Sequence, residues 1–127
     1  MNKLKLLLID RNDESRHNTW LKLPSSNYEI FQATDAPSAL RLCRSEKIDC
    51  VVLSYDLPDI PALRLLLQLV SRPRCPEIAV ICLIWPNIPY MAQLLRKNGA
   101  QACLPKTHTG EQITTAIQKA IAAAESR

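Results

Sequence analysis

One stretch of the sequence, Ile48–Leu63, limits the fold more than any other. Its first six residues, Ile48–Leu53, are mostly apolar and rich in β-branched side chains. This pattern is typical of a strand buried on both faces or of a piece of buried helix. Acidic and proline residues between 56 and 61 then break the run, which favours the strand, and leucines recur at helical spacing up to Val70. The stretch therefore predicts a strand, a loop and a helix. In an open parallel sheet chemistry lies at the carboxyl end of such a strand, where Ser54 stands.

The rest of the chain repeats this alternation. We expect strands at Leu4–Ile9, Tyr28–Ala33, Ile48–Leu53, Ile78–Ile84 and Ala100–Leu104. We expect helices at Glu14–Leu23, Ala36–Glu46, Ile60–Val70 and Asn87–Asn98, and a last one after Thr109. Their ends carry capping signals, among them a Thr109–Gln112 capping box and Gly99 after a helix. The expected N-caps of the first four helices are Asn12 or Asp13, Asp35, Asp59 and Asn87. The sequence therefore predicts one α/β domain, residues 1–127. Its sheet is parallel and doubly wound, with five strands in the order 2-1-3-4-5 and five helices on its two faces.

Composition excludes several classes of protein. The 127 residues include only two glycines, too few for a glycine-rich phosphate loop, and no run approaches a membrane span. The net charge of +4 is modest and forms no basic block, so nucleic acid is not an expected partner. The five cysteines form no CxxC pair, and Cys50, Cys82 and Cys103 fall in apolar runs. We therefore expect buried free thiols in a reducing compartment and a cytoplasmic protein.

The central stretch resembles the phosphoacceptor segment of receiver domains, the CheY-like modules of bacterial response regulators. In that family the strand ends in an aspartate, a proline lies four residues later and a glycine eight residues later. Here Pro58 and Ala62 stand at those distances from Ser54, so Ser54 takes the place of the acceptor. Asp56 does not fit that place, because Pro58 would follow it by only two residues. The resemblance covers the whole chain and implies the flavodoxin-like fold.

The other functional positions of the family are mostly changed as well. Asp10 takes the place of the first of two acids that hold Mg²⁺, and Lys106 takes the place of the lysine that neutralises the phosphoryl group. The remaining positions differ from the family pattern: Arg11 replaces the second acid, Ile84 the Thr or Ser, Trp85 a small residue, and Cys103 an aromatic. We expect the Arg11 guanidinium to occupy the space of the ion and to point toward Asp10 and Asp56, with Lys106 close by.

These changes predict a pseudo-receiver that is not an enzyme and holds no metal or cofactor. Mg²⁺ is held mainly by carboxylates, and Arg11 brings a permanent cation into the same pocket. A serine hydroxyl needs a base to become a nucleophile, and His17 and His108 are expected on the surface. Two alternatives stay open. Asp56 could serve as a surrogate phosphoacceptor, or a small ligand could bind in a pocket under Trp85.

The resemblance also implies a partner surface on the fourth and fifth helices. We assign to it the residues Tyr90, Leu94, Lys97 and Gln118. The expected partner is a protein: a signalling kinase, a regulator, an output domain of the same protein, or a second copy that forms a homodimer. The sequence leaves open which partner binds and whether an output domain follows Arg127.

Overall fold

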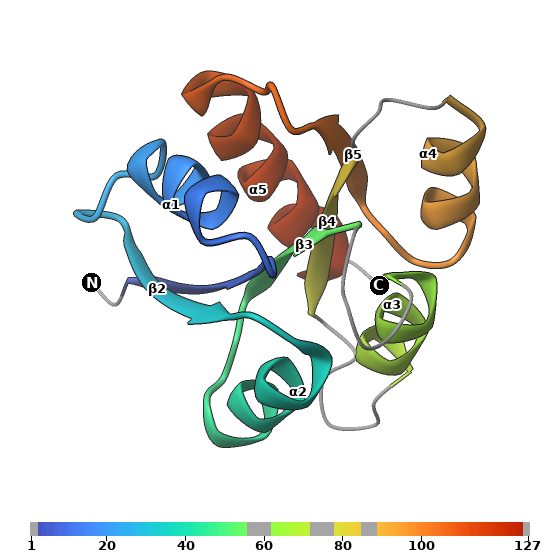
Figure 1. Cartoon of the computed structure of the whole chain (residues 1–127), viewed down its shortest axis with the longest axis horizontal. Helices are drawn as coiled ribbons and strands as arrows, with labels where there is room; N and C mark the ends of the chain where they lie inside the picture. The colour runs from blue at the N-terminus through green and yellow to red at the C-terminus, as the bar shows by residue number, and fades with distance from the viewer. Residues whose placement is uncertain (1–2, 56–61, 72–77, 85–88, 126–127) are drawn as a thin grey trace.

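The computed structural model describes residues 3–55, 62–71, 78–84 and 89–125. Within these ranges strand and helix alternate five times (Figure 1). The strands are β1 (Leu4–Ile9), β2 (Tyr28–Ala33), β3 (Cys50–Ser54), β4 (Ala79–Ile84) and β5 (Ala102–Pro105). The helices are α1 (Asp13–Leu21), α2 (Ala36–Ser45), α3 (Ala62–Val70), α4 (Pro89–Lys97) and α5 (Gly110–Glu125). All strand pairs are parallel, and the order is β2-β1-β3-β4-β5, which confirms the predicted topology.

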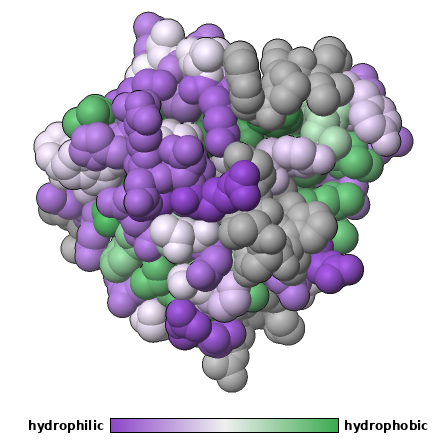
Figure 2. All heavy atoms as spheres, viewed as in Figure 1, coloured by the Kyte–Doolittle hydropathy of each residue, from purple (hydrophilic) through white to green (hydrophobic). Residues whose placement is uncertain are grey.

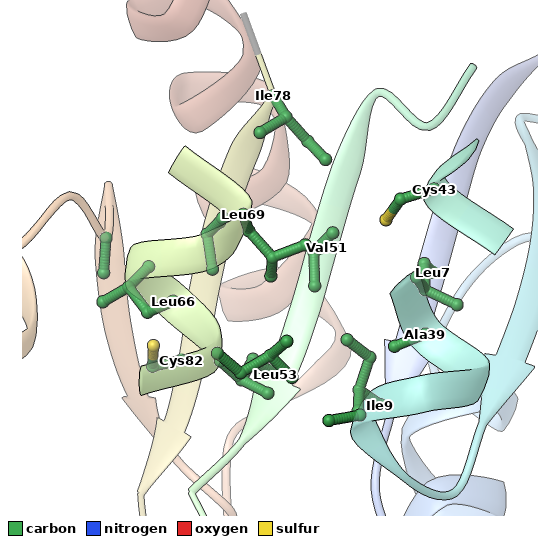
Figure 3. Close-up of a cluster of buried hydrophobic side chains, with 14 of the residues drawn as sticks. Leu7, Ile9, Ala39, Cys43, Val51, Leu53, Leu66, Leu69, Ile78 and Cys82 are labelled. Carbon is green, nitrogen blue, oxygen red and sulfur yellow. The ribbon is translucent and has the colours of Figure 1, made fainter. Parts of the chain in front are cut away.

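Both faces of the sheet are covered by helices, α1 and α5 on one side and α2 and α3 on the other (Figure 1). Successive side chains of a strand point to opposite faces, so each central strand contributes to two cores. Leu7 of β1 and Val51 of β3 pack with α2 and α3, as Figure 3 shows. Leu6 and Val52 pack on the other face with α5. This two-sided burial explains why β3 and β4 have no exposed residue and read as unbroken apolar runs.

The helix ends follow the predicted capping signals. The Asn12 side chain accepts a 2.8 Å hydrogen bond from the Ser15 backbone N–H at the start of α1, and Asp35 caps α2 in the same way. The Thr109 hydroxyl accepts from the Gln112 N–H at 3.1 Å, and the Gln112 side chain accepts from the Thr109 N–H at 2.8 Å. This reciprocal pair is the predicted capping box. The predicted caps of α3 and α4, Asp59 and Asn87, lie outside the described residues.

Gly99 ends α4 in a conformation that requires glycine. Its φ is +117°, and the backbone N–H of Ala100 returns to the Leu95 carbonyl at 3.1 Å. A methyl group at position 99 would lie 2.9 Å from Val70 Cγ1 at the end of α3. Glycine therefore both turns the chain and lets α4 approach α3.

Some predicted boundaries are wrong by one or two residues. The third strand begins at Cys50, not at Ile48. The reason is Asp49, whose carboxylate accepts the Lys5 backbone N–H at 2.8 Å, so a side chain replaces a backbone carbonyl there. The fifth strand begins at Ala102, after the turn that ends α4.

The thiols of the sheet lie largely inside the domain. Cys50 and Cys82 are buried and free, as predicted, and Cys103 is half-buried. Burial raises the pKa of the Cys50 thiol, because a thiolate would lose its hydration there. In the described part of the chain no helix has both the length and the apolar character needed to cross a membrane.

Two neighbouring leucines of α3 test this core. Leu66 is 0% exposed and Leu67 is 43% exposed. Replacing Leu66 by alanine leaves a cavity, so we expect Leu66→Ala to lower the free energy of unfolding by about 2–5 kcal/mol. The matched Leu67→Ala change should cost less than about 1 kcal/mol. Urea unfolding of the two variants measures the difference, and equal losses would contradict the described packing of α3.

Candidate functional site

The carboxyl ends of the parallel strands place three of the predicted site residues at one edge of the sheet. Ile9 of β1 and Leu53 of β3 are register partners, so the residues that follow them, Asp10 and Ser54, stand at neighbouring strand ends. Lys106 directly follows β5. Ligand sites of open α/β sheets lie outside such strand ends. We therefore take this edge as the candidate site. Asp56 and Trp85 lie outside the described residues.

Asp10 is the best-connected residue of this edge. It is only 4% exposed. One carboxylate oxygen accepts the Asn12 backbone N–H at 3.0 Å, and the other accepts the Ser15 hydroxyl at 2.6 Å. The Lys106 ammonium lies 3.8 Å from the second oxygen, at the outer limit of an ion pair. A buried carboxylate needs such partners.

Arg16 fixes the loop that carries Asp10. Its guanidinium donates to the Asp10 backbone carbonyl at 2.7 Å and to the Asp13 carboxylate at 2.7 Å. Its Nε donates to the Gln32 side chain of the neighbouring strand at 2.8 Å. The roles of Ser15 and Arg16 were not predicted from the sequence. The Asn12 cap could have pointed to them, because it places the first turn of α1 beside the end of β1.

Arg11 and Ser54 occupy very different surroundings. Arg11 is exposed, whereas Ser54 is buried as the last residue of β3. Among the described residues, the cation within ion-pair distance of the Asp10 carboxylate is Lys106. The prediction that the Arg11 guanidinium points toward Asp10 and Asp56 stays a prediction, because Asp56 lies outside the described residues.

The described residues of this edge do not by themselves fit a Mg²⁺ ion. Mg²⁺ requires a near-octahedral shell of oxygen atoms at short distances. The described residues offer one carboxylate, Asp10, whose oxygens already accept two hydrogen bonds, and a buried hydroxyl, Ser54. No group of three or more His, Cys, Asp or Glu side chains in the described ranges is arranged to hold a metal.

Ile84 and Cys103, which replace a Thr or Ser and an aromatic of the family pattern, lie on the last two strands. Ile84 is buried at the end of β4, opposite Pro105, and its alkyl side chain cannot donate a hydrogen bond. Cys103 lies on β5, and its thiol donates to the Ala92 carbonyl of α4 at 3.7 Å. Position 84 thus holds an alkyl side chain, and position 103 holds a thiol.

A polar pocket and an apolar groove lie at the surface of the described residues. A polar pocket of about 290 Å³ opens beside Lys106 and is lined mainly by α1, from Asn12 to Thr19. Figure 2 shows that hydrophilic residues gather over α1 on this face. A wider apolar groove of about 570 Å³ lies between β5 and α5, and none of the predicted site residues lines it.

The predicted partner residues lie on the two helices that flank β5 (Figure 1). Tyr90 of α4 is 68% exposed. Lys97 of α4 and Gln118 of α5 are also exposed, and Leu94 of α4 is half-buried. Their exposure is compatible with a binding surface, and the assignment stays a prediction.

The prediction that His108 lies on the surface is wrong. His108 is buried, and its Nδ1 lies 2.9 Å from the Pro105 carbonyl. A carbonyl only accepts, so Nδ1 carries the proton, and the buried Nε2 has no hydrogen-bond partner among the described residues. Lys22 explains the burial, because its ammonium donates to the His108 carbonyl at 2.7 Å and joins the end of α1 to the turn before α5. His17 is exposed as predicted and stacks on Trp20.

Comparison with known proteins points to one family. A family model described as the response regulator receiver domain matches residues 6–118. A two-component response regulator-like protein of Arabidopsis thaliana is 28% identical, over 75% of this chain and 22% of that protein. The CAI-1 autoinducer sensor kinase/phosphatase of Vibrio cholerae is also 28% identical, over 75% of this chain and 14% of that protein. The chain thus spans less than a quarter of either curated relative.

Solved structures agree on the fold. A response regulator receiver domain protein of Clostridium thermocellum is 26% identical, with a TM-score of 0.85 over 96% of this chain and 97% of that chain. The chemotaxis response regulator CheY4 of Vibrio cholerae has a TM-score of 0.84 at 18% identity, over 94% of this chain and 99% of that chain. At that identity the second likeness concerns the fold alone.

His108 makes the stability of the domain depend on pH. Burial lowers the pKa of His108 from its ordinary value, because the imidazolium would lose hydration, and the Lys22 charge acts in the same direction. The unfolded chain therefore binds this proton more readily. We expect the free energy of unfolding to fall as the pH drops below about 6.5.

Urea unfolding between about pH 5 and pH 7.5 measures this slope of the free energy of unfolding against pH, and His108→Gln should remove part of it. His17→Gln, at an exposed histidine, should leave the slope unchanged. Equal slopes in all three proteins would contradict the role of His108.

Proposed function

This chain belongs to the family of response regulator receiver domains, and from that membership we propose that it is a pseudo-receiver. It is a module of two-component-type signal transduction that acts by binding another protein, without phosphorylation of an aspartate. In this proposal it is not an enzyme and uses no metal or cofactor.

One observation carries the proposal. The side chain at the carboxyl end of the central strand β3 is the Ser54 hydroxyl, where the family has a carboxylate. A hydroxyl becomes a nucleophile only with an activating base. Both histidines of the chain make other contacts. The His17 ring stacks on Trp20 with 5.6 Å between the ring centroids, and His108 Nδ1 pairs with the Pro105 carbonyl.

The charges at the matched positions support the same conclusion. One carboxylate, Asp10, remains beside two cations, Arg11 and Lys106. A divalent cation entering this pocket would meet repulsion on the order of a few kcal/mol from each cation at an effective dielectric near 20. Water lowers the contribution of Arg11, which is exposed. Lys106, half-buried and 3.8 Å from Asp10, is screened less.

The relatives support a role within a larger signalling system. Both curated relatives are several times longer than the matched segment. The one of Vibrio cholerae is described as a sensor kinase/phosphatase. We assign to this chain a protein partner of that system, which is a kinase, a regulator, an output domain or a second copy. The proposed contact surface is Tyr90, Leu94, Lys97 and Gln118.

A titration tests the absence of phosphoryl chemistry. We expect no saturable change in amide shifts at Asp10, Ser54 and Lys106 when Mg²⁺ is added, with or without beryllofluoride, and no covalent label from acetyl phosphate. The double variant Arg11→Asp/Ser54→Asp is the matched control. It restores the missing carboxylates and should bind Mg²⁺, because carboxylates are the ligands that this ion prefers.

The outcomes of this titration separate the alternatives. A Mg²⁺ response at Asp10 and Ser54 in the unchanged chain would show that the site is active and the proposal wrong. A label on Asp56 would support the surrogate acceptor. A rise in melting temperature on addition of a small metabolite would support ligand sensing, because a ligand of the folded state stabilises it.

Self-association tests the contact surface in the case where the partner is a second copy. We expect concentration-dependent dimers in sedimentation velocity. Tyr90→Ala and Lys97→Glu should each raise the dissociation constant about tenfold or more, because exposed aromatic anchors dominate such interfaces. The matched controls, Leu67→Ala on α3 and Arg41→Glu on α2, should leave it unchanged. A chain that stays monomeric, or dimers weakened only by the controls, would contradict self-association through α4 and α5.

A further inference from the structure

Two cysteines face each other across the last two strands. Cys82 of β4 and Cys103 of β5 are register partners. Register partners point to the same face of a sheet, and neighbouring strands lie about 4.8 Å apart. Disulfides form between Cα atoms about 4.4–6.8 Å apart, and the spacing of neighbouring strands lies within that range. Cys82 points to the face covered by α3 (Figure 3).

The two thiols are chemically unequal. A hydrogen bond from the Cys82 thiol lowers the pKa of Cys103, and the nearby Arg96 charge acts in the same direction, while burial opposes both. The same hydrogen bond and burial raise the pKa of Cys82. The Ala92 carbonyl, which accepts the Cys103 S–H at 3.7 Å, favours the thiol form of Cys103.

The two thiols also differ in their exposure to solvent. Cys103 is half-buried, whereas Cys82 is fully buried. The thiolate is the reactive form of cysteine. Cys103 is therefore the thiol that reacts first, and Cys82 is in place to react second.

We propose that Cys82 and Cys103 form an oxidation site that takes hydrogen peroxide and closes to a disulfide between β4 and β5. The Cys103 thiolate attacks one peroxide oxygen, the O–O bond breaks, and water leaves after protonation, which gives a sulfenic acid on Cys103. The Cys82 sulfur then attacks the Cys103 sulfur. The S–S bond forms, the S–O bond breaks, and hydroxide leaves with the Cys82 proton as a second water. The peroxide is reduced and the two thiols are oxidised.

The disulfide would change how β5 meets α4. Cys103 would lose the thiol hydrogen that it donates to the Ala92 carbonyl. This hydrogen bond joins β5 to α4, so oxidation weakens the contact between that helix and the sheet. This consequence does not depend on the pseudo-receiver proposal.

Peptide mapping tests the site in the reduced, folded chain. A Cys75→Ser background removes the thiol that lies outside the described residues. After hydrogen peroxide and N-ethylmaleimide, we expect a peptide pair linked through Cys82 and Cys103. Cys50→Ala is the matched control and should not change this yield, because Cys50 is buried on β3 away from the pair.

Variants of each partner distinguish the two roles. With Cys82→Ala, the link should vanish and Cys103 should be trapped as a sulfenic acid by dimedone. With Cys103→Ala, Cys82 should stay reduced. If Cys82→Ala unfolds, Cys82→Val fills the apolar site and replaces it. Recovery of both cysteines as alkylated thiols after peroxide, or a link of either one to Cys43 or Cys50, would overturn the proposal.

Discussion

The burial of β3 on all sides is the constraint on which the rest of this domain depends. Every residue of the strand is buried, and its backbone pairs with β1 on one side and β4 on the other. Backbone groups so far from water must be paired, and side chains on both faces must be covered. The parallel neighbours and the helix layers satisfy these needs together. β3 can therefore contribute to a ligand site only at its carboxyl end, at the edge where Asp10 and Lys106 also lie.

This arrangement separates the fold from the chemistry at its edge. The sheet needs apolar residues along its strands, but it does not need an acid at position 54. A buried carboxylate at position 10 does need partners, and the Asn12 N–H, the Ser15 hydroxyl and the Lys106 ammonium supply them. A receiver fold can thus keep a well-ordered edge when the residue that ends β3 is not an acid. Function must be argued from the site, because the fold allows several.

The sequence predicts this structure well where its signals are local. Alternating apolar runs fix the topology, and Thr109 and Gly99 mark helix ends because capping and positive φ depend on a few adjacent residues. The sequence does not predict the contacts that form only when a helix packs against other elements. His108 stands among polar residues, yet the packing of α1 through Lys22 buries it. Ser15 reaches Asp10 only because α1 starts at a particular angle to β1. The residue types of the site were therefore predictable, but the hydrogen bonds of Asp10 to Asn12 and Ser15 were not.

The position of β1 inside the sheet also affects how the chain is made. β1 leaves the ribosome first, yet it lies between β2 and β3 in the finished sheet. Its contact with the third strand begins with a hydrogen bond between Lys5 and Asp49, which are 44 residues apart. Until that later segment is synthesised, the backbone N–H and C=O groups on that edge of β1 have no native strand to pair with. During translation β1 therefore stays unpaired on this edge until β3 has been made. Over that time its free backbone groups can pair with other chains.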